Sequence, residues 1–118
     1  MPAPPGLLAA YPGLRETDEA DPAVRTRLNV RDSDAVLVLH LDDLDHSPGT
    51  LLTVEVAESL GRPLLVARAD HFEGAVEVER WTRMLPAGCR LDVAGPRESQ
   101  DPGLYAAAYS LLRTLWTP

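Results

Sequence analysis

Three short apolar runs, separated by segments of helical length, constrain the fold of this chain more than any other feature. The runs are "AVLVLHL" (35–41), "PLLVARA" (63–69) and "CRLDVAG" (89–95). A continuous apolar run of this length is typical of a strand that is covered on both faces. Strands that alternate with helices are joined by crossovers and lie parallel. The sequence therefore predicts an α/β fold, a three-layer, Rossmann-like parallel sheet with crossover helices.

Helix signals lie in the segments around these runs. One helix is expected from Gly49 to Gly61, and a last helix opens at Asp101-Pro102. Another precedes the first run, with Asp21 as its N-cap and Pro22 at its first position. Residues expected to face inward recur every three or four positions: Leu52, Val56 and Leu60; Val78, Trp81 and Leu85; Leu104, Ala108, Leu111 and Leu115.

The chain length suits one domain. We assign residues 11–118 to this domain and residues 1–10, which include the Pro-rich "MPAPPG", to an extended N-terminal segment. The N-terminus lacks a positive region followed by an apolar stretch, so it does not read as a secretory signal. The longest apolar runs fall far short of a membrane span.

Charge and cysteine content narrow the function. The formal net charge is −7, which disfavours nucleic acids and anionic membranes as partners. All eleven basic residues are arginines, so neither a lysine Schiff base nor a Walker-type lysine is available. Cys89 is the single cysteine, which leaves no intrachain disulfide and fits a cytoplasmic location.

Ligands of open parallel sheets bind at the carboxyl ends of the strands. Three loops follow those ends: 41–50, 69–73 and 95–101. In the first, Gly49 and Thr50 begin a helix whose free N–H groups could hold an anion, although plain helix capping explains the same pattern. The acidic and histidine side chains of this loop suggest a cation site or, more simply, a solvated loop: Asp42, Asp43, Asp45 and His46.

The loop after the third run contains Arg97, whose planar guanidinium suits phosphate or carboxylate. The alternative is a surface ion pair between Arg97 and Glu98, worth little energetically. In the segment before the first run, Asn29 is a poor helix former, so it either contacts a partner group or only fixes the turn before the strand.

Taken together, three motifs resemble a known family. They are "RTRLNVRDSDAVLVL", "SPGTLLTVEVAESLGRPLLV" and "LDVAGPRESQDPGLYAAAYSLL". Their order and spacing resemble those of the molybdenum carrier proteins related to bacterial YpsA, within the SLOG superfamily of the Lonely Guy and Smf proteins. The resemblance covers about residues 11 to 116.

The resemblance implies a nucleotide or nucleotide-like ligand, for which molybdenum cofactor is one candidate; a magnesium ion could accompany it. It also implies which residues lie near the ligand: Gly49, Thr50, Gly95, Arg97, Glu98 and Ser99, supported by Arg25, Asn29 and Ser33. We assign no catalytic residue and no metal ligand.

The sequence departs from the family pattern in two places. Relatives open with a strand and a "GGQTGAD"-like phosphate loop, and nothing similar precedes Tyr11. Either the start lies too late or a part of the site has been lost. Pro48 stands where relatives have glycine, which removes an N–H donor.

Three functions remain open. The first is a binding protein for a phosphorylated small molecule. The second is a structural subunit without a ligand. The third is phosphoribohydrolase activity, disfavoured because Thr53 stands where Lonely Guy relatives have a catalytic glutamate. A missing strand would leave apolar surface on 35–41 or on a neighbouring helix, so we also expect a homo-oligomer.

Overall fold

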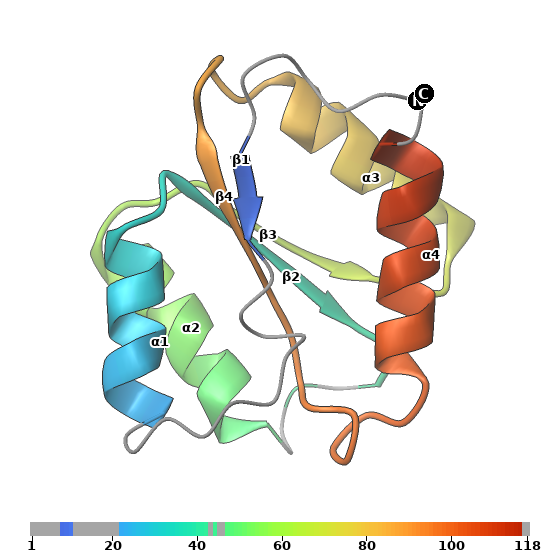
Figure 1. The fold of residues 1–118 in the computed structure, drawn as a ribbon, viewed down its shortest axis with the longest axis horizontal. Helices are drawn as coiled ribbons and strands as arrows, with labels where there is room; N and C mark the ends of the chain where they lie inside the picture. The colour runs from blue at the N-terminus through green and yellow to red at the C-terminus, as the bar shows by residue number, and fades with distance from the viewer. Residues whose placement is uncertain (1–7, 11–21, 43, 45–46, 117–118) are drawn as a thin grey trace.

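The structure is a computed structural model, and it describes residues 8–10, 22–42, 44 and 47–116. In chain order the elements of this part are β1 (Leu8–Ala10), α1 (Pro22–Arg31), β2 (Ala35–His40), α2 (Pro48–Ser59), β3 (Leu64–Arg68), α3 (Phe72–Arg83), β4 (Arg90–Ala94) and α4 (Leu104–Trp116). The four strands form one parallel sheet in the order β1-β4-β2-β3 (Figure 1). The predicted α/β, Rossmann-like fold is confirmed.

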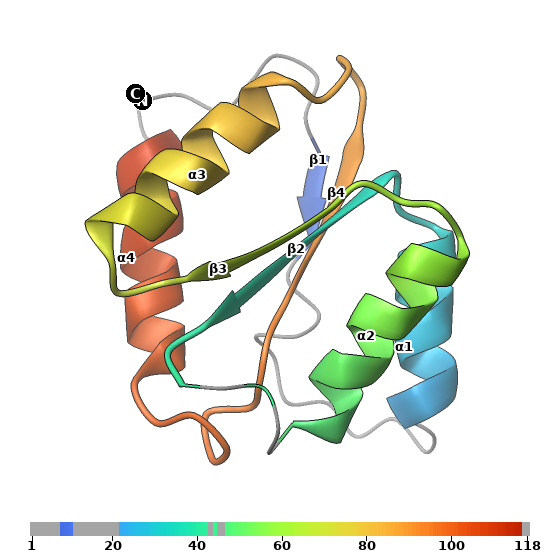
Figure 2. The ribbon, with the colours of Figure 1, turned by 180° about the vertical axis from the view of Figure 1, so that it is seen from behind.

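The helices cover both faces of the sheet. The chain moves outward from β2 to β3 and then returns to β4, so α2 and α3 lie on opposite faces if both crossovers are right-handed. Figures 1 and 2 show α1 and α2 on one face and α3 and α4 on the other. The structure therefore has the three layers expected from the sequence.

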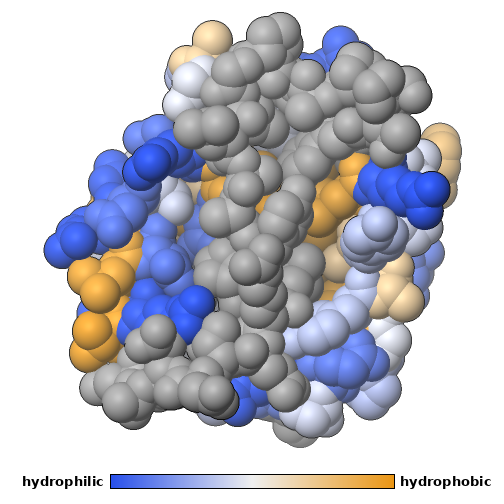
Figure 3. All heavy atoms as spheres, viewed as in Figure 1, coloured by the Kyte–Doolittle hydropathy of each residue, from blue (hydrophilic) through white to orange (hydrophobic). Residues whose placement is uncertain are grey.

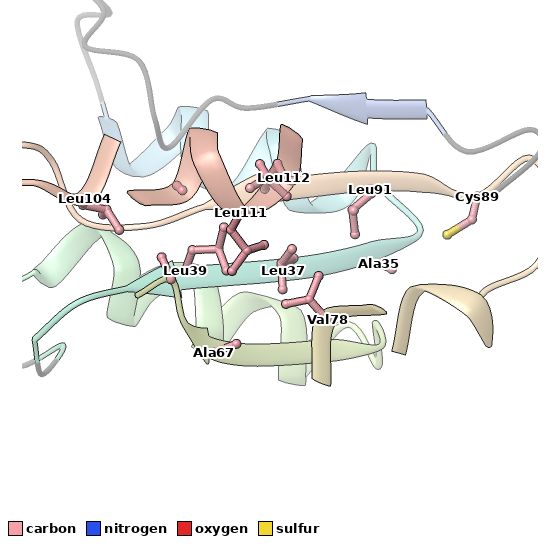
Figure 4. Packing of buried hydrophobic residues seen from close by; sticks show 13 residues of the cluster. Ala35, Leu37, Leu39, Ala67, Val78, Cys89, Leu91, Leu104, Leu111 and Leu112 are labelled. Carbon is pink, nitrogen blue, oxygen red and sulfur yellow. The ribbon is translucent and has the colours of Figure 1, made fainter. Parts of the chain in front are cut away.

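The core lies on both sides of β2, because successive side chains of a strand point to opposite faces. Ala35, Leu37 and Leu39 are fully buried in a cluster with residues of α3 and α4, such as Val78 and Leu104 (Figure 4). Val36 and Val38 are fully buried on the other face, against α1 and α2. The apolar surface that we expected on residues 35–41 is therefore covered over 35–39.

The strand β1 was not foreseen. Its three residues pair with β4 in the register Leu8↔Arg90 to Ala10↔Asp92. The segment that the sequence analysis set apart as an extended N-terminus thus contributes to the sheet at these three positions. The predicted N-cap at Asp21 and the side chain of Leu115 lie outside what the structure describes.

The face of α2 that packs on the sheet differs from the prediction. Thr50, Thr53 and Ala57 are buried there, whereas Leu60 is exposed. Leu52 and Val56 are only partly buried. Small side chains let the helix lie close to the sheet, and the apolar periodicity did not reveal this because α2 carries apolar residues around most of its circumference.

The predicted inward faces of the other two helices are confirmed where they are described. Val78, Leu104, Ala108 and Leu111 are buried, and Trp81 and Leu85 pack partly buried against the same cluster. Gly61 ends α2 with a φ of 67°, a conformation that glycine adopts without strain. No helix among the described residues is long and apolar enough to cross a membrane.

Candidate functional site: the carboxyl ends of β2 and β4

A crevice for a ligand is expected where two adjacent parallel strands send their following helices to opposite faces of the sheet. The neighbours β2 and β4 meet this condition. The chain leaves β2 toward α2 on one face and leaves β4 toward α4 on the other (Figures 1 and 2). The loops 41–47 and 95–103 therefore flank the topological switch point of the sheet.

Asp101 joins these two loops across the switch point. Its Oδ2 accepts hydrogen bonds from the backbone N–H groups of Leu41, at 2.8 Å, and of Asp42, at 3.2 Å. The residue is buried, with 4% of its surface exposed. The carboxylate thus satisfies donors at the end of β2 and holds the two loops beside each other.

Glu98 caps α4. Its Oε2 accepts a hydrogen bond of 2.6 Å from the N–H of Gly103, and its Oε1 accepts one of 3.1 Å from the N–H of Tyr105. These two backbone donors lower the pKa of Glu98. The helix begins at Leu104 rather than at Asp101-Pro102. Residues 98–103 form a turn instead, and the Glu98 carboxylate in this turn accepts hydrogen bonds at the helix N-terminus.

Arg97 is the cation of the same loop. Its backbone N–H donates to Oε1 of Gln100 at 3.0 Å, and its carbonyl accepts from the N–H groups of Gln100 and Asp101. The side chain is exposed, and within the described part of the chain its guanidinium has no hydrogen bond or ion pair. The ion pair with Glu98, the alternative considered for Arg97, does not form among the described residues, because the Glu98 carboxylate accepts hydrogen bonds from the α4 backbone. Ser99 is also exposed.

The other flank of the crevice is the start of α2. Gly49 and Thr50 lie in its first turn, where Ser47 is the N-cap and Pro48 removes one N–H donor. The hydroxyl groups of Ser47 and Thr50 are buried and lie 2.6 Å apart, hydrogen-bonded to each other. A Cβ built on Gly49 would meet nothing within 4 Å, so the backbone there is open to close approach.

Thr53 is the residue that the resemblance aligns with the catalytic acid of Lonely Guy proteins. Its Oγ1 donates a hydrogen bond of 3.0 Å to the carbonyl of Gly49, and the residue is buried. Glu55 is exposed. No carboxylate therefore takes the place of that acid on α2.

Gly95 has a packing role in this structure. A Cβ at this position would lie 2.3 Å from the carbonyl oxygen of Leu39 and 3.3 Å from Cδ2 of Leu104. Glycine is therefore required for the close approach of β4, β2 and α4 at the edge of the sheet. This requirement stands whether or not a ligand lies nearby.

The three supporting residues on and after α1 are spread over its length. Arg25 and Asn29 lie on the helix and are partly buried. Ser33 follows the helix, and its hydroxyl donates to the carbonyl of Asn29 at 2.6 Å. Ser33 precedes β2 and so lies at the amino ends of the parallel strands, whereas Gly49 and Arg97 follow strands and lie at their carboxyl ends. From there Ser33 does not reach a ligand that contacts Gly49 and Arg97.

At the end of β3, Arg68 and Asp70 form an ion pair with each other. Nε of Arg68 lies 3.2 Å from Oδ1 of Asp70, and His71 lies 3.9 Å from the same carboxylate. The described residues contain no group of three or more His, Cys, Asp or Glu placed to hold a metal ion. Three residues of the cation hypothesis, Asp43, Asp45 and His46, lie outside the described residues.

Sequence reasoning missed two buried carboxyl groups: Asp101, which joins two loops, and Asp92, which lies inside the sheet. Asp101 was interpreted only as the start of a helix, since its contact with Leu41 joins positions 60 residues apart. Asp92 lies in β4 with 2% of its surface exposed. A charged residue inside an apolar strand run was the available signal for Asp92.

Comparisons to known proteins agree with this α/β fold. Residues 3–116 match the family described as "Circularly permutated YpsA SLOG family". This chain belongs to the circularly permuted YpsA family. The resemblance inferred from the motifs is thereby confirmed, and the match extends into the first ten residues.

A solved structure shares the fold of this YpsA-family chain. It is the protein called "Putative molybdenum carrier protein" from Syntrophus aciditrophicus SB, with 27% sequence identity and a TM-score of 0.71. The similarity covers 95% of this chain and 78% of that protein. Among curated proteins, none matches.

Proposed function

We propose that this YpsA-family chain is a small-molecule binding protein for a nucleotide or a phosphorylated, nucleotide-like ligand. The ligand would lie in the crevice between the loops after β2 and β4, with its anionic group at Arg97 and the first turn of α2. The observation that carries the proposal is the position of an exposed guanidinium, without a partner among the described residues, at the switch point of a parallel sheet.

The neighbouring carboxylates support this choice of Arg97. Glu98 and Asp101 both direct carboxylate oxygens to backbone N–H groups. A carboxylate that accepts backbone hydrogen bonds has less need of a cationic partner. Arg97 therefore remains available to an external anion, for which its planar fork provides two parallel donors.

Gly49 and Thr50 would complete the site from the other side. The N-terminus of a helix favours negative charge, and the open space at Gly49 permits a ligand to approach the backbone. Pro48 reduces the number of donors, so Arg97 would supply the larger share of the binding. Of the remaining predicted residues, Ser99 lies next to Arg97 in the loop, and Arg25 and Asn29 lie on α1, the helix beside α2.

Molybdenum cofactor is one candidate ligand, suggested by the name of the structural relative. The residues here fit the phosphate of such a cofactor through Arg97 and backbone donors. Within the described residues, no set of side chains is placed to ligate the metal itself. The part of the cofactor that this chain would hold is therefore its anionic group.

Thermal unfolding in the presence of candidate ligands tests the proposal. The panel contains inorganic phosphate, molybdate, nucleoside monophosphates and pterin phosphates, each with and without Mg²⁺. A ligand at 100 times its dissociation constant adds about 2.7 kcal/mol of stability, which is readily measured in a domain of this size. At least one member of the panel should raise the melting temperature of the wild-type protein.

The variant Arg97→Ala should lose this stabilisation. Arg80→Ala is the matched control, because Arg80 is an exposed arginine of α3 and its loss changes the net charge equally. Equal ligand stabilisation in Arg97→Ala and the wild type would show that binding occurs elsewhere. No stabilisation by any ligand would favour the alternative, a structural subunit without a ligand.

A further inference from the structure

The loop after β4 already places two of its own carboxylates on backbone donors at the carboxyl-end edge of the sheet. Glu98 accepts hydrogen bonds from Gly103 and Tyr105 at the N-terminus of α4. Asp101 accepts hydrogen bonds from Leu41 and Asp42 beyond the end of β2. Both sets of N–H groups are typical positions for phosphate oxygens in parallel α/β proteins. The protein itself therefore occupies two of the anion-binding positions at this edge.

Among the described residues, two arginines end or follow the strands at this edge: Arg68 is the last residue of β3, and Arg97 follows β4. Arg97 has no ion pair within the described residues. On the adjacent strand, Arg68 is engaged by Asp70 through two hydrogen bonds of 3.2 and 3.3 Å. Arg68 also interacts electrostatically with Asp42 and Asp101. A second anionic group bound next to the first would therefore approach carboxylates, and the nearby Arg68 is already engaged by carboxylates of the protein.

Like charges repel over such short distances, and the repulsion is stronger where burial lowers the local dielectric. Asp101 is almost fully buried, and its carboxyl group lies between the loops after β2 and β4. A chain of phosphates would have to bring its second phosphate past this charge. A single phosphate or oxyanion at Arg97 would avoid it.

We infer that Asp101 and Glu98 are specificity-determining residues that restrict the crevice to ligands with one anionic group, such as a phosphate monoester or an inorganic oxyanion, and exclude polyphosphates. This inference rests on the proposed function. It narrows the ligand class from nucleotides in general to monophosphates and related single anions.

Isothermal titration calorimetry without divalent cations tests the inference, with two series of probes. One series is phosphate, pyrophosphate and tripolyphosphate, and the other is AMP, ADP and ATP. Wild-type protein should bind the first member of each series at least about tenfold more tightly than the others, the factor expected from one neighbouring negative charge at a partly buried site.

The variants Asp101→Asn and Glu98→Gln keep an oxygen acceptor for the backbone donors and remove the charge. Each should reduce the preference for the first member of the series by raising the affinity for the longer ones. Glu77→Gln is the matched control, because Glu77 is an exposed residue of α3 and its loss changes the net charge equally. It should leave the preference unchanged. Circular dichroism spectra and melting curves confirm that each variant is folded.

The outcomes separate this inference from the proposed function. If the wild type binds ATP as tightly as AMP, or if the preference persists in both charge-removing variants, the specificity role is wrong while the binding function stands. If the wild type binds neither these probes nor any other member of the ligand panel, the proposed function fails and the inference fails with it.

Discussion

Asp92 lies inside the sheet with no hydrogen-bond partner for Oδ1. It belongs to β4, pairs in register with Val36 of β2, and has 2% of its surface exposed. Burial disfavours the charged form of a carboxyl group, and it raises the pKa of Asp92 from 3.8 to about 6. The folded protein therefore binds the proton of this residue more tightly than the unfolded chain does.

This shift predicts how Asp92 contributes to stability as the pH changes. The contribution is most favourable below the unfolded pKa of 3.8, and it is lost as the pH rises toward the folded value of about 6. We expect Asp92→Asn to gain about 2 kcal/mol relative to the wild type between pH 4 and pH 7.5, given about 1.4 kcal/mol per pKa unit. Urea unfolding at the two pH values measures this difference, and a constant difference would contradict the prediction.

Gly95 permits a second test at the scale of one residue. We expect Gly95→Ala to destabilise the protein by about 1–3 kcal/mol, the cost of forcing extra volume into a packed site. The added Cβ would lie 2.3 Å from the carbonyl oxygen of Leu39. Gly49→Ala is the control, because its Cβ would meet nothing within 4 Å. Urea unfolding of both variants provides the comparison, and equal stability would mean that β4 can shift freely.

Thr53 leads to a prediction about chemistry. We expect no hydrolysis of nucleoside monophosphates to base and ribose phosphate. The reaction needs a carboxylate to stabilise the ribosyl centre, and the buried Thr53 donates its hydroxyl to the Gly49 carbonyl instead. The assay is release of ribose phosphate by purified protein. Release that disappears in Arg97→Ala would overturn this expectation.

At the scale of the element, α4 depends on a residue outside its own bounds. Glu98 lies six residues before Leu104 in the chain, and its carboxylate accepts hydrogen bonds from the N–H groups of Gly103 and Tyr105. The arrangement satisfies two donors at the helix N-terminus and places a negative charge at the positive end of the helix dipole.

The lowered pKa of Glu98 determines the pH at which this cap acts. A carboxyl group with a depressed pKa stabilises the folded state above its unfolded pKa, and this effect is lost as the pH falls through the folded value. We expect Glu98→Ala to have a lower melting temperature than the wild type at pH 7, with a smaller difference at pH 3. Glu77→Ala, on the surface of α3, should change little at either pH. A difference for Glu98→Ala that is independent of pH would show that the charge has no part in capping.

At the scale of the whole molecule, exposed apolar side chains lie on the helices of both faces rather than on β2. On the α3 and α4 side they are Phe72, Met84 and Tyr109. Val24 and Leu28, one turn apart on α1, are 48% and 41% exposed. Leu51 of α2 and Leu60, the C-cap residue of α2, are 43% and 44% exposed. Figure 3 shows hydrophobic side chains at the left margin of the molecule, where α1 lies. These residues replace the 35–41 strand as the surface on which an oligomer contact is expected.

We predict a homodimer or larger assembly with an apolar contact of at least about 1,000 Å² in total. Light scattering at micromolar concentration gives the mass of the particle. Leu28→Ser should shift the mass toward that of the monomer without lowering the melting temperature extrapolated to low concentration. A monomer at all concentrations would contradict the prediction.

The sequence by itself determined the class of the fold and the edge of the sheet at which to look for a site. Apolar runs at 35–41, 63–69 and 89–95 predict strands covered on both faces. This holds for β2 and most of β4, whereas β3 lies at the edge of the sheet and is only partly buried. The motif around Arg97 indicated the family. These features are local in the chain, so periodicity and spacing reveal them.

Only the tertiary structure decided which groups meet. Asp101 reaches the N–H groups of Leu41 and Asp42, about 60 positions earlier in the chain, because β2 and β4 are neighbours in the sheet. Ser33 lies at the amino end of the sheet and Gly49 at its carboxyl end although only 16 positions separate them, because the strand β2 runs between them. The short strand β1 has too few residues to form a pattern, and its pairing with β4 depends on contacts distant in sequence. Contacts of this kind follow from the packing of the complete chain and leave no local signal.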